Sequence, residues 1–174
     1  MRVVYFSAEM FNDAMFFIEK AKSFEPEPQN DWLRWRYLRA TILYTFACLE
    51  SVINGLIIGK AKEKGQEALV KKIKEESISL IDKVSDIYPG LIGISFNKNR
   101  KEWNYFMDVR KIRNLISHYT GGTEIYNDDA IYGVNISNAE KSIEMVRIMV
   151  TYLYEVSNME IPQWVYQEKS KIIK

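Results

Sequence analysis

The chain has 174 residues, of which 47% are apolar and 27% charged, a composition typical of one folded globular domain and not of a disordered segment. Its 24 Lys and Arg residues against 23 Asp and Glu residues give a formal net charge of +1, which excludes a strongly basic, histone-like binder. The single cysteine, Cys48, excludes an internal disulfide framework and a cysteine-based zinc site. The single histidine, His118, excludes an HExxH metal centre, and the eight glycines form no GxGxxG or P-loop motif.

The N-terminal half of the chain predicts two long helices. Apolar residues recur at helical spacing over residues 7–24, with Ser7 as the expected N-cap. A second helix is expected to begin at Asn30 or Asp31 and to continue to about residue 64, where Gly65 ends it.

Part of this second helix, residues 40–59, is apolar enough to be compared with a membrane span. Glu50 and Asn54 lie near its middle, and a carboxylate at that depth costs about 2.5–3.5 kcal/mol. Residues 1–6 are also too short for the apolar core of a signal peptide. We therefore expect a buried core helix, a cytoplasmic protein and no membrane partner.

The second half of the chain predicts further helices separated by turns. A third helical region covers residues 66–87 and is expected to stop before Pro89, and a fourth helix runs from about residue 100 to residue 120. A short strand is expected within residues 131–136, followed by a fifth helix, which Ser137 or Asn138 caps and which ends near residue 157. The tail is expected to form one more short helix. The pattern predicts a single all-α domain over residues 1–174, an up-and-down bundle of four principal helices with short extra helices.

The fourth helix has two distinct faces. At about 100° per residue, one side collects an apolar stripe that should pack on the bundle. The stripe consists of Phe106, Val109, Ile112, Ile116 and Tyr119. Asn114 and His118 lie four residues apart on a second face together with Met107, and Arg113 falls at the edge of the stripe. The second face is therefore expected to serve something other than the helix's own core.

The spacing of Arg113, Asn114 and His118 resembles the RxxxxH motif, in its RNxxxH form, of the HEPN superfamily. The segment ACLESVINGLI, residues 47–57, is similar to the second helix of such domains, where an acidic or amide side chain approaches the motif. Glu50 and Asn54 would supply it here, with Tyr119 as a further supporting residue. The resemblance covers about residues 30–157. It implies an all-α domain and, as in many members, a metal-independent ribonuclease without a cofactor.

The chemistry of these side chains suits RNA cleavage. Histidine titrates near neutrality and can act as a base or an acid, whereas arginine stays charged and fits phosphate oxygens bidentately. Asn114 can orient His118 or bind the phosphate. One histidine per chain is too few for two-step acid–base work, so the resemblance implies a homodimer in which two His118 side chains face one groove.

A stretch of basic residues lies beside the motif. Residues 98–113 carry six Lys or Arg residues against two acids, and five of them are expected to track RNA phosphates. These five are Lys98, Arg100, Lys101, Arg110 and Lys111. A second basic cluster, DWLRWRYLR at residues 31–39, has aromatic residues between its arginines. It either stacks bases or is the start of an amphipathic helix with solvated arginines.

The sequence therefore favours a HEPN-like endoribonuclease that acts on RNA as a toxin or as a defence or stress nuclease. An antitoxin or a regulatory protein is the expected partner. HEPN toxins paired with nucleotidyltransferase antitoxins carry a tyrosine two residues beyond the histidine, whereas here Tyr119 is adjacent to it and residue 120 is threonine. Two alternatives stay open. One is a HEPN-like module without catalysis that binds nucleotides, RNA or protein. The other is an unrelated helical scaffold in which Arg113 pairs with Glu50 and His118 is a C-terminal helix cation.

Overall fold

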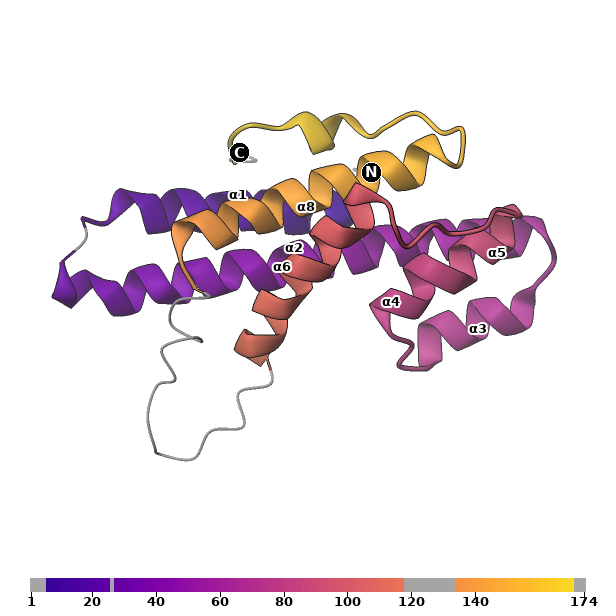
Figure 1. Cartoon of the computed structure of the whole chain (residues 1–174), viewed down its shortest axis with the longest axis horizontal. Coiled ribbons are helices and arrows are strands. Elements are labelled where there is room, and N and C mark those ends of the chain that lie inside the picture. Colours follow the sequence, from indigo (N-terminus) through magenta and orange to yellow (C-terminus); the bar gives the residue numbers. More distant parts are fainter. Residues whose placement is uncertain (1–5, 26, 118–133, 171–174) are drawn as a thin grey trace, which may run out of the picture.

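The computed structural model describes residues 6–25, 27–117 and 134–170, and within these ranges the chain forms helices and no strand. Its long elements are α1 (Phe6–Ser23), α2 (Pro28–Glu63), α6 (Lys101–Ser117) and α8 (Ile136–Glu155) (Figure 1). The predicted all-α class is confirmed. The predicted final helix is also present, as the 3-10 helix η2 (Gln163–Tyr166).

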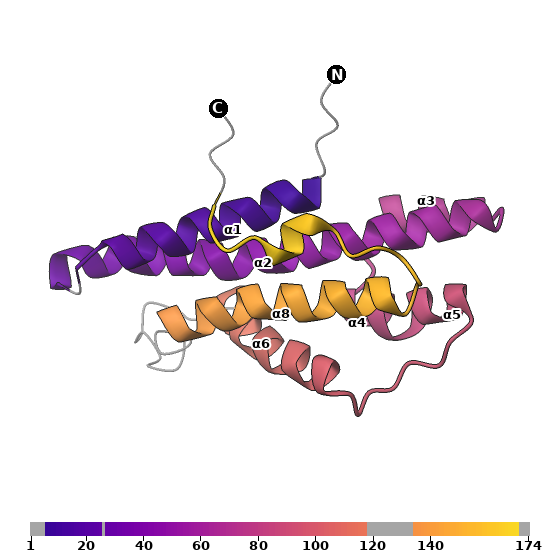
Figure 2. The same ribbon diagram turned by 90° about the horizontal axis from the view of Figure 1, so that it is seen from above.

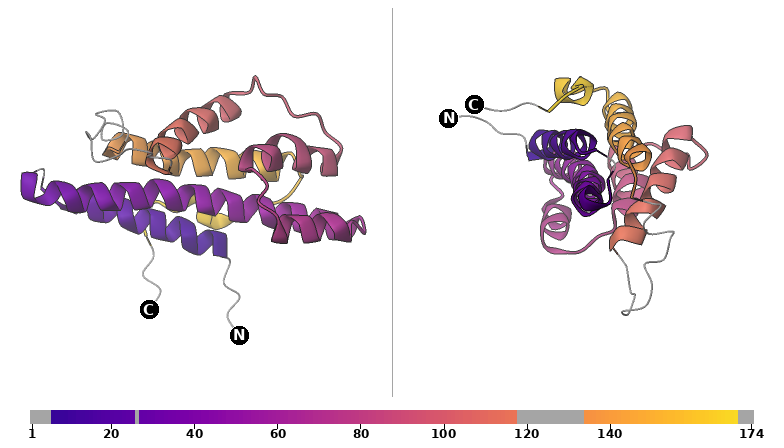
Figure 3. Two further views of the ribbon diagram at one scale, coloured as in Figure 1. Left: turned by 90° about the horizontal axis from the view of Figure 1, so that it is seen from below. Right: turned by 90° about the vertical axis from the view of Figure 1, so that its left-hand side faces the viewer.

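The four long helices alternate in direction and share one hydrophobic core. α1 runs back along α2, α8 lies against both, and α6 crosses α8 (Figures 1 and 2). The end-on view in Figure 3 shows α1 and α6 on opposite sides of this arrangement, with η2 beside α8. α2 therefore occupies the centre of the molecule and contacts every other long helix.

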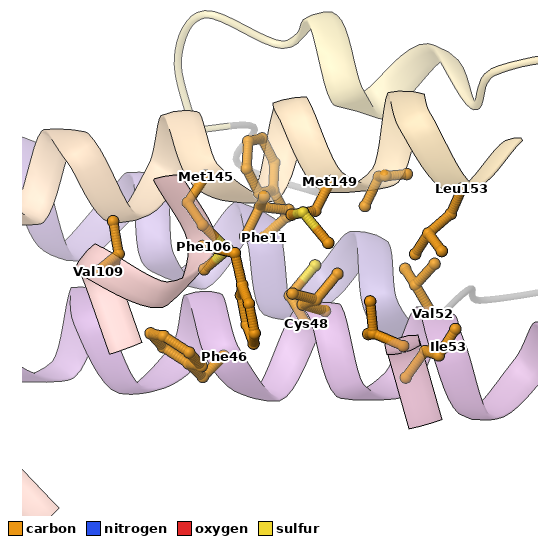
Figure 4. Close-up of a cluster of buried hydrophobic side chains, with 14 of the residues drawn as sticks. Phe11, Phe46, Cys48, Val52, Ile53, Phe106, Val109, Met145, Met149 and Leu153 are labelled. Carbon is orange, nitrogen blue, oxygen red and sulfur yellow. The ribbon is translucent and has the colours of Figure 1, made fainter. Parts of the chain in front are cut away.

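Large side chains from all four helices meet in this core (Figure 4). Phe11 of α1, Ile53 of α2 and Phe106 of α6 are fully buried, and Met149 of α8 is 1% exposed. Each such side chain contributes roughly 1.5–3 kcal/mol of hydrophobic stabilisation when it leaves water. Cys48 is also fully buried and acts as a small core residue. Burial raises the pKa of its thiol, so the thiol stays protonated.

α2 is also the helix whose composition invited comparison with a membrane span. Residues Gln29–Glu63 are long and apolar enough to cross a membrane by length and composition. In the fold, Ile42, Leu49 and Ile57 of this helix are fully buried against protein. The central position of α2 in the bundle thus gives these three residues protein neighbours, whereas Leu33 and Leu43 of the same helix stay about 40% exposed.

The ends of two helices differ from the prediction. α2 begins at Pro28, before Asn30 and Asp31, because proline at the first helical position has the required φ and loses no hydrogen bond. α8 is capped by the side chain of Asn135, which accepts a 2.8 Å hydrogen bond from the backbone N–H of Asn138. The expected caps, Ser137 and Asn138, are therefore already helical. Of the strand expected over residues 131–136, the first three residues lie outside the described ranges, and the last one begins α8.

The third helical region is not one helix, and Pro89 does not end it. α3 (Glu67–Glu75) stops early, and a second helical stretch consists of α4 (Leu80–Asp82), the π-helical turn η1 (Lys83–Ile87) and α5 (Tyr88–Ile92). Pro89 has no N–H to donate and its ring crowds the carbonyl one turn earlier. The wider π turn directly before it relieves this crowding, so the stretch continues through the proline.

The π turn brings a lysine against α2. Lys83 Nζ lies 2.6 Å from Glu50 Oε1, and the Lys83 side chain is 4% exposed whereas that of Glu50 is 46% exposed. A buried ammonium requires a partner, and Glu50 supplies one while keeping part of its carboxylate in water. This ion pair joins the helical stretch 80–92 to the central helix.

The unequal burial of the two partners predicts unequal costs of removing them. Glu50→Ala should lower the free energy of unfolding by about 2–4 kcal/mol because it leaves the Lys83 ammonium buried and unpaired. Lys83→Met should lower it by less than about 1 kcal/mol, since a hydrophobic side chain replaces the ammonium and water solvates the remaining carboxylate. Urea unfolding of both variants measures the difference.

Glu63 offers a matched control, because its ion pair with Lys60 is exposed on both sides. Glu63→Ala should change the stability by less than about 0.5 kcal/mol. Equal losses in Glu50→Ala and Lys83→Met would contradict this account of the ion pair.

Candidate functional site

The first half of α6 packs into the core, as the apolar stripe predicted. Phe106 is fully buried, Val109 is 2% exposed and Trp103 is 7% exposed. Ile112 and Ile116, one and two turns further along, are half-buried and pack against the same core. The stripe therefore fixes the rotation of the helix about its axis and decides which later residues point inward.

Arg113 is one of these inward residues. It follows Phe106 by two helical turns and is half-buried, as a residue at the edge of the stripe would be. Its Cζ atom lies 6.0 Å from the centroid of the Phe46 ring of α2. An aromatic face attracts a cation without neutralising it, and partial burial strengthens the attraction of that cation for an anion.

Asn114 lies next to Arg113 and contacts it. Arg113 Nη1 donates a hydrogen bond to Asn114 Oδ1 over 3.3 Å, and Asn114 is also half-buried. Met107, expected on the same free face, instead packs partly buried against the core. His118 and Tyr119 lie outside the described residues, directly beyond Ser117, the last residue of α6 that the structure describes.

The ion pair between Glu50 and Arg113, which the sequence left open, is not formed. Glu50 pairs with Lys83, and Arg113 lies over Phe46, one helical turn before Glu50. Asn54 follows Glu50 by one turn, and its Oδ1 atom is buried without a hydrogen-bond partner in the part of the chain that the structure describes. Glu50 and Asn54 were both expected to support Arg113 and Asn114. Glu50 instead pairs with Lys83 of the π turn.

Lys83 was missed by the sequence reasoning. The sequence nevertheless indicates that Lys83 is buried, because it lies between the apolar residues Ile81 and Val84. A charged residue inside an apolar periodic run needs a buried partner, and Glu50 in α2 is in the same situation. The two could have been paired on that ground, although the π turn that aligns them could not have been foreseen.

The five basic residues expected to bind phosphate do not share one face. Lys101 and Arg110 are nine residues apart on α6, which places them on opposite sides of the helix. Lys111 is exposed and pairs with Asp108 over 2.8 Å, and Lys98 is exposed in the segment before α6. Arg110 precedes Arg113 by three residues and is half-buried on the same side. Of the five, Arg110 therefore extends the surface around Arg113.

Arg100 is held away from this surface by its own contacts. Its Nε lies 3.2 Å from Glu102 Oε2, and its Cζ lies 4.6 Å from the centroid of the Tyr152 ring. The hydrogen bond holds the pKa of Glu102 below its usual value and raises the pKa of Arg100, so both groups stay charged and paired. A carboxylate already occupies the position that a phosphate would take.

The geometry suits the binding of an anion. Arg113 contributes a charged, planar donor group that is partly desolvated, and Asn114 fixes its orientation through the shared hydrogen bond. Among the described residues, no group of three or more His, Cys, Asp or Glu side chains is close enough to hold a metal ion. A phosphate oxygen at this site could therefore accept hydrogen bonds from the guanidinium of Arg113 and the amide of Asn114.

No protein-family model matches this chain, and neither a curated protein nor a solved structure matches it. The interpretation of the site therefore depends on its residues and their geometry.

The contacts of Arg113 predict a modest role in stability. Arg113→Ala should lower the free energy of unfolding by about 1–2 kcal/mol, because the side chain gives up one long hydrogen bond to a neutral amide, one cation–π contact and some packing of its stem. Removal of one partner of a buried ion pair would cost about 3–5 kcal/mol. Thermal and urea unfolding measure the loss. Phe106→Ala, which should cost about 3–5 kcal/mol, serves as the reference for a core position in the same helix. A comparable loss in Arg113→Ala would assign Arg113 a structural role.

Proposed function

We propose that this chain is a metal-independent endoribonuclease of the HEPN type. One observation carries the proposal: Arg113 and Asn114 are half-buried and hydrogen-bonded to each other in the last turns of α6, five and four residues before His118. Residues that only solvate a helix surface would extend into water. An arginine that lies over a buried ring and keeps its charge is suited to a phosphodiester.

The proposed reaction is transesterification at an RNA phosphate. His118 removes the proton of the 2′-hydroxyl, and the 2′-oxygen attacks the adjacent phosphorus. The bond from phosphorus to the 5′-oxygen breaks, and this oxygen takes a proton from a second acid. The products are a 2′,3′-cyclic phosphate and a 5′-hydroxyl. Arg113 stabilises the additional negative charge on the phosphorane through two hydrogen bonds, and Asn114 orients His118 or binds the phosphate.

The second acid is the reason for proposing a homodimer. The chain has one histidine, and the reaction removes a proton from the 2′-oxygen and donates a proton to the 5′-oxygen. A two-fold axis that brings the two His118 side chains to one groove supplies both groups, with Tyr119 and Asn54 as supporting residues. We propose a cytoplasmic toxin or a defence or stress nuclease, with an antitoxin or regulatory protein as its partner.

The mechanism predicts cleavage of single-stranded RNA in the presence of EDTA. His118→Ala should lower the rate by roughly 10²–10⁴-fold, the usual range for the loss of a general acid or base. Arg113→Ala should lose a comparable amount, and Arg113→Lys should recover only part, because a point charge cannot replace the bidentate guanidinium. Gel analysis of one end-labelled RNA measures all four proteins at matched circular dichroism.

Two controls make this experiment decisive. An RNA with a 2′-deoxy group at the cleaved position should stay intact, because the nucleophile is missing. Equal cleavage by the wild type and His118→Ala would identify a contaminating nuclease. If neither the wild type nor any variant cleaves any of several RNAs, the proposal that this chain is a ribonuclease is wrong.

The composite site predicts a dimer at micromolar concentration. Leu115 is 45% exposed on the outer side of the last turns of α6, close to Asn114. If these turns face the partner, Leu115→Glu should place two charges at the interface and shift the sedimentation coefficient to that of a monomer. Met159→Glu is the matched control, since Met159 is 48% exposed beyond α8. A wild-type protein that sediments as a monomer would contradict the composite site.

A non-catalytic module is the second candidate. It is favoured by the net charge of +1 and by the scatter of the five basic residues over different faces. Such a module would bind a strand of RNA but leave it intact, and Arg113→Ala would weaken binding without any change in product.

A further inference from the structure

A groove of about 700 Å³ runs along one side of α8. Its floor is a single face of this helix within residues 144–155, because the lining positions recur at helical spacing. The first turn of α6, residues 101–105, forms one wall, and residues 165–168 of the C-terminal tail form the other. Figures 2 and 3 show α8 with α6 on one side and η2 on the other. Three separate segments of the chain therefore enclose the groove.

Arg147 attaches the tail wall to the floor. Its Nη2 donates a 2.7 Å hydrogen bond to the carbonyl oxygen of Gln167, and its Nε donates a 3.2 Å hydrogen bond to that of Val165. Its Nη1 lies 3.4 Å from Glu144 Oε2. Each nitrogen atom of this guanidinium thus contacts a protein oxygen, so Arg147 shapes the groove and is not free to attract an anionic ligand.

The charge of the lining favours a cation. Among the described residues, four glutamates and two basic residues line the groove. Two of these glutamates already pair with arginines, whereas Glu155 and Glu168 are exposed and form no ion pair within the described ranges. Carboxylates without a basic partner give a groove a negative potential, which its low-dielectric walls concentrate. The groove is therefore suited to attract positive charge.

Tyr152 adds a polar group inside the groove. This residue lines the floor and is only 6% exposed, so its small exposed part opens on the groove. Its ring is held in place by Arg100, whose Cζ lies 4.6 Å from the ring centroid, and by the ring of Phe96 at 6.1 Å. The hydroxyl oxygen forms no hydrogen bond with any described residue and remains accessible. A hydroxyl in this position is available to a ligand that donates an N–H group.

The two unpaired carboxylates lie at opposite ends of the groove. Glu168 is near Glu144, since both also line a smaller neighbouring cavity of about 450 Å³. Glu144 and Glu155 are eleven residues apart, about 16 Å along the axis of α8, and the apolar Ile148 lies between them. Within the described ranges, no cluster of three or more such acidic side chains is close enough to hold a metal ion. A ligand that reaches both ends therefore has cationic groups separated by an apolar chain.

We propose that this groove binds a linear aliphatic polyamine. One terminal ammonium donates hydrogen bonds to the Glu155 carboxylate and the Tyr152 hydroxyl, and the other donates to the Glu168 carboxylate. The methylene chain lies over Ile148. The ring of Tyr166, 64% exposed on the tail wall, offers its face to an inner ammonium group.

The groove is separate from the candidate anion site. Arg113 lies twelve residues beyond Lys101 on α6, about 18 Å along the helix axis. The groove is acidic, whereas the surface around Arg113 is basic. Polyamine binding therefore does not depend on the proposed ribonuclease function.

Calorimetry at physiological ionic strength tests the ligand class with spermine, spermidine, putrescine and butylamine. Spermine should bind, and putrescine should bind at least about tenfold more weakly, because its shorter chain reaches one end of the groove and loses a charged hydrogen bond at the other. Butylamine, with a single charge, should give no measurable heat of binding.

Three variants remove the proposed contacts of spermine. Glu155→Gln and Glu168→Gln keep the shape of each side chain and should each weaken binding about threefold, with about tenfold for the double variant. Tyr152→Phe keeps the ring and should weaken binding about threefold through the lost hydroxyl. Glu160→Gln, at an exposed glutamate of the same tail, and Tyr44→Phe, at a tyrosine of α2, are the matched controls outside the groove. Both controls should change binding by less than about 1.5-fold.

The outcomes separate specific binding from general attraction between charges. Weakening by the three groove variants and by neither control supports the polyamine site. Absence of spermine binding, or equal weakening by Glu160→Gln and Glu155→Gln, overturns it. A wild-type protein that cleaves RNA but does not bind spermine rejects the polyamine site alone. A protein that binds spermine through Glu155 but never cleaves RNA rejects the proposed ribonuclease alone.

Discussion

The arrangement of the candidate site depends on the contact between two phenylalanine rings. Phe106 of α6 packs against Phe46 of α2 with ring centroids 6.1 Å apart, and Trp103 supports Phe106 from one turn earlier, at 5.3 Å. Together with the packing of the α6 stripe on α8, this contact fixes the rotation of α6 relative to the central helix. Because Arg113 follows Phe106 by two turns on the same side, it is placed over the same Phe46 ring. One buried aromatic residue therefore anchors the helix and positions the cation.

The ion pair between Lys83 and Glu50 affects the same region through charge. Glu50 follows Phe46 by one turn of α2, and a free carboxylate there would repel a phosphate bound at Arg113. Its pairing with the buried Lys83 ammonium weakens that repulsion. Lys83 is the first residue of the π turn that precedes Pro89, so the residue that pairs with Glu50 and the turn that accommodates the proline belong to one segment.

Helical periodicity was sufficient to predict the class and most of the elements. The long helices 6–23, 28–63 and 136–155 lie within a few residues of the expected ranges, since their apolar stripes face a continuous core. The predicted helix ends were wrong at two prolines, because proline usually interrupts a helix. Pro28 is instead the first residue of α2, and Pro89 follows a π turn that lets the helical stretch continue. The partner of Glu50 could not be predicted from spacing, because it lies 33 residues away and depends on the register of that turn.

The structure also distinguishes among the cations that the sequence placed in one basic stretch. Arg100 and Lys111 are paired with carboxylates, so part of the positive charge of each is already compensated by Glu102 or Asp108. Arg113 contacts an aromatic ring and a neutral amide, and neither contact reduces its formal charge. A guanidinium that lies over an aromatic face keeps the N–H donors at its edge for an anion. The phosphate site that we propose within residues 98–113 therefore depends less on the number of basic residues than on their partners: Arg113 contacts a ring and an amide, whereas Arg100 and Lys111 contact carboxylates.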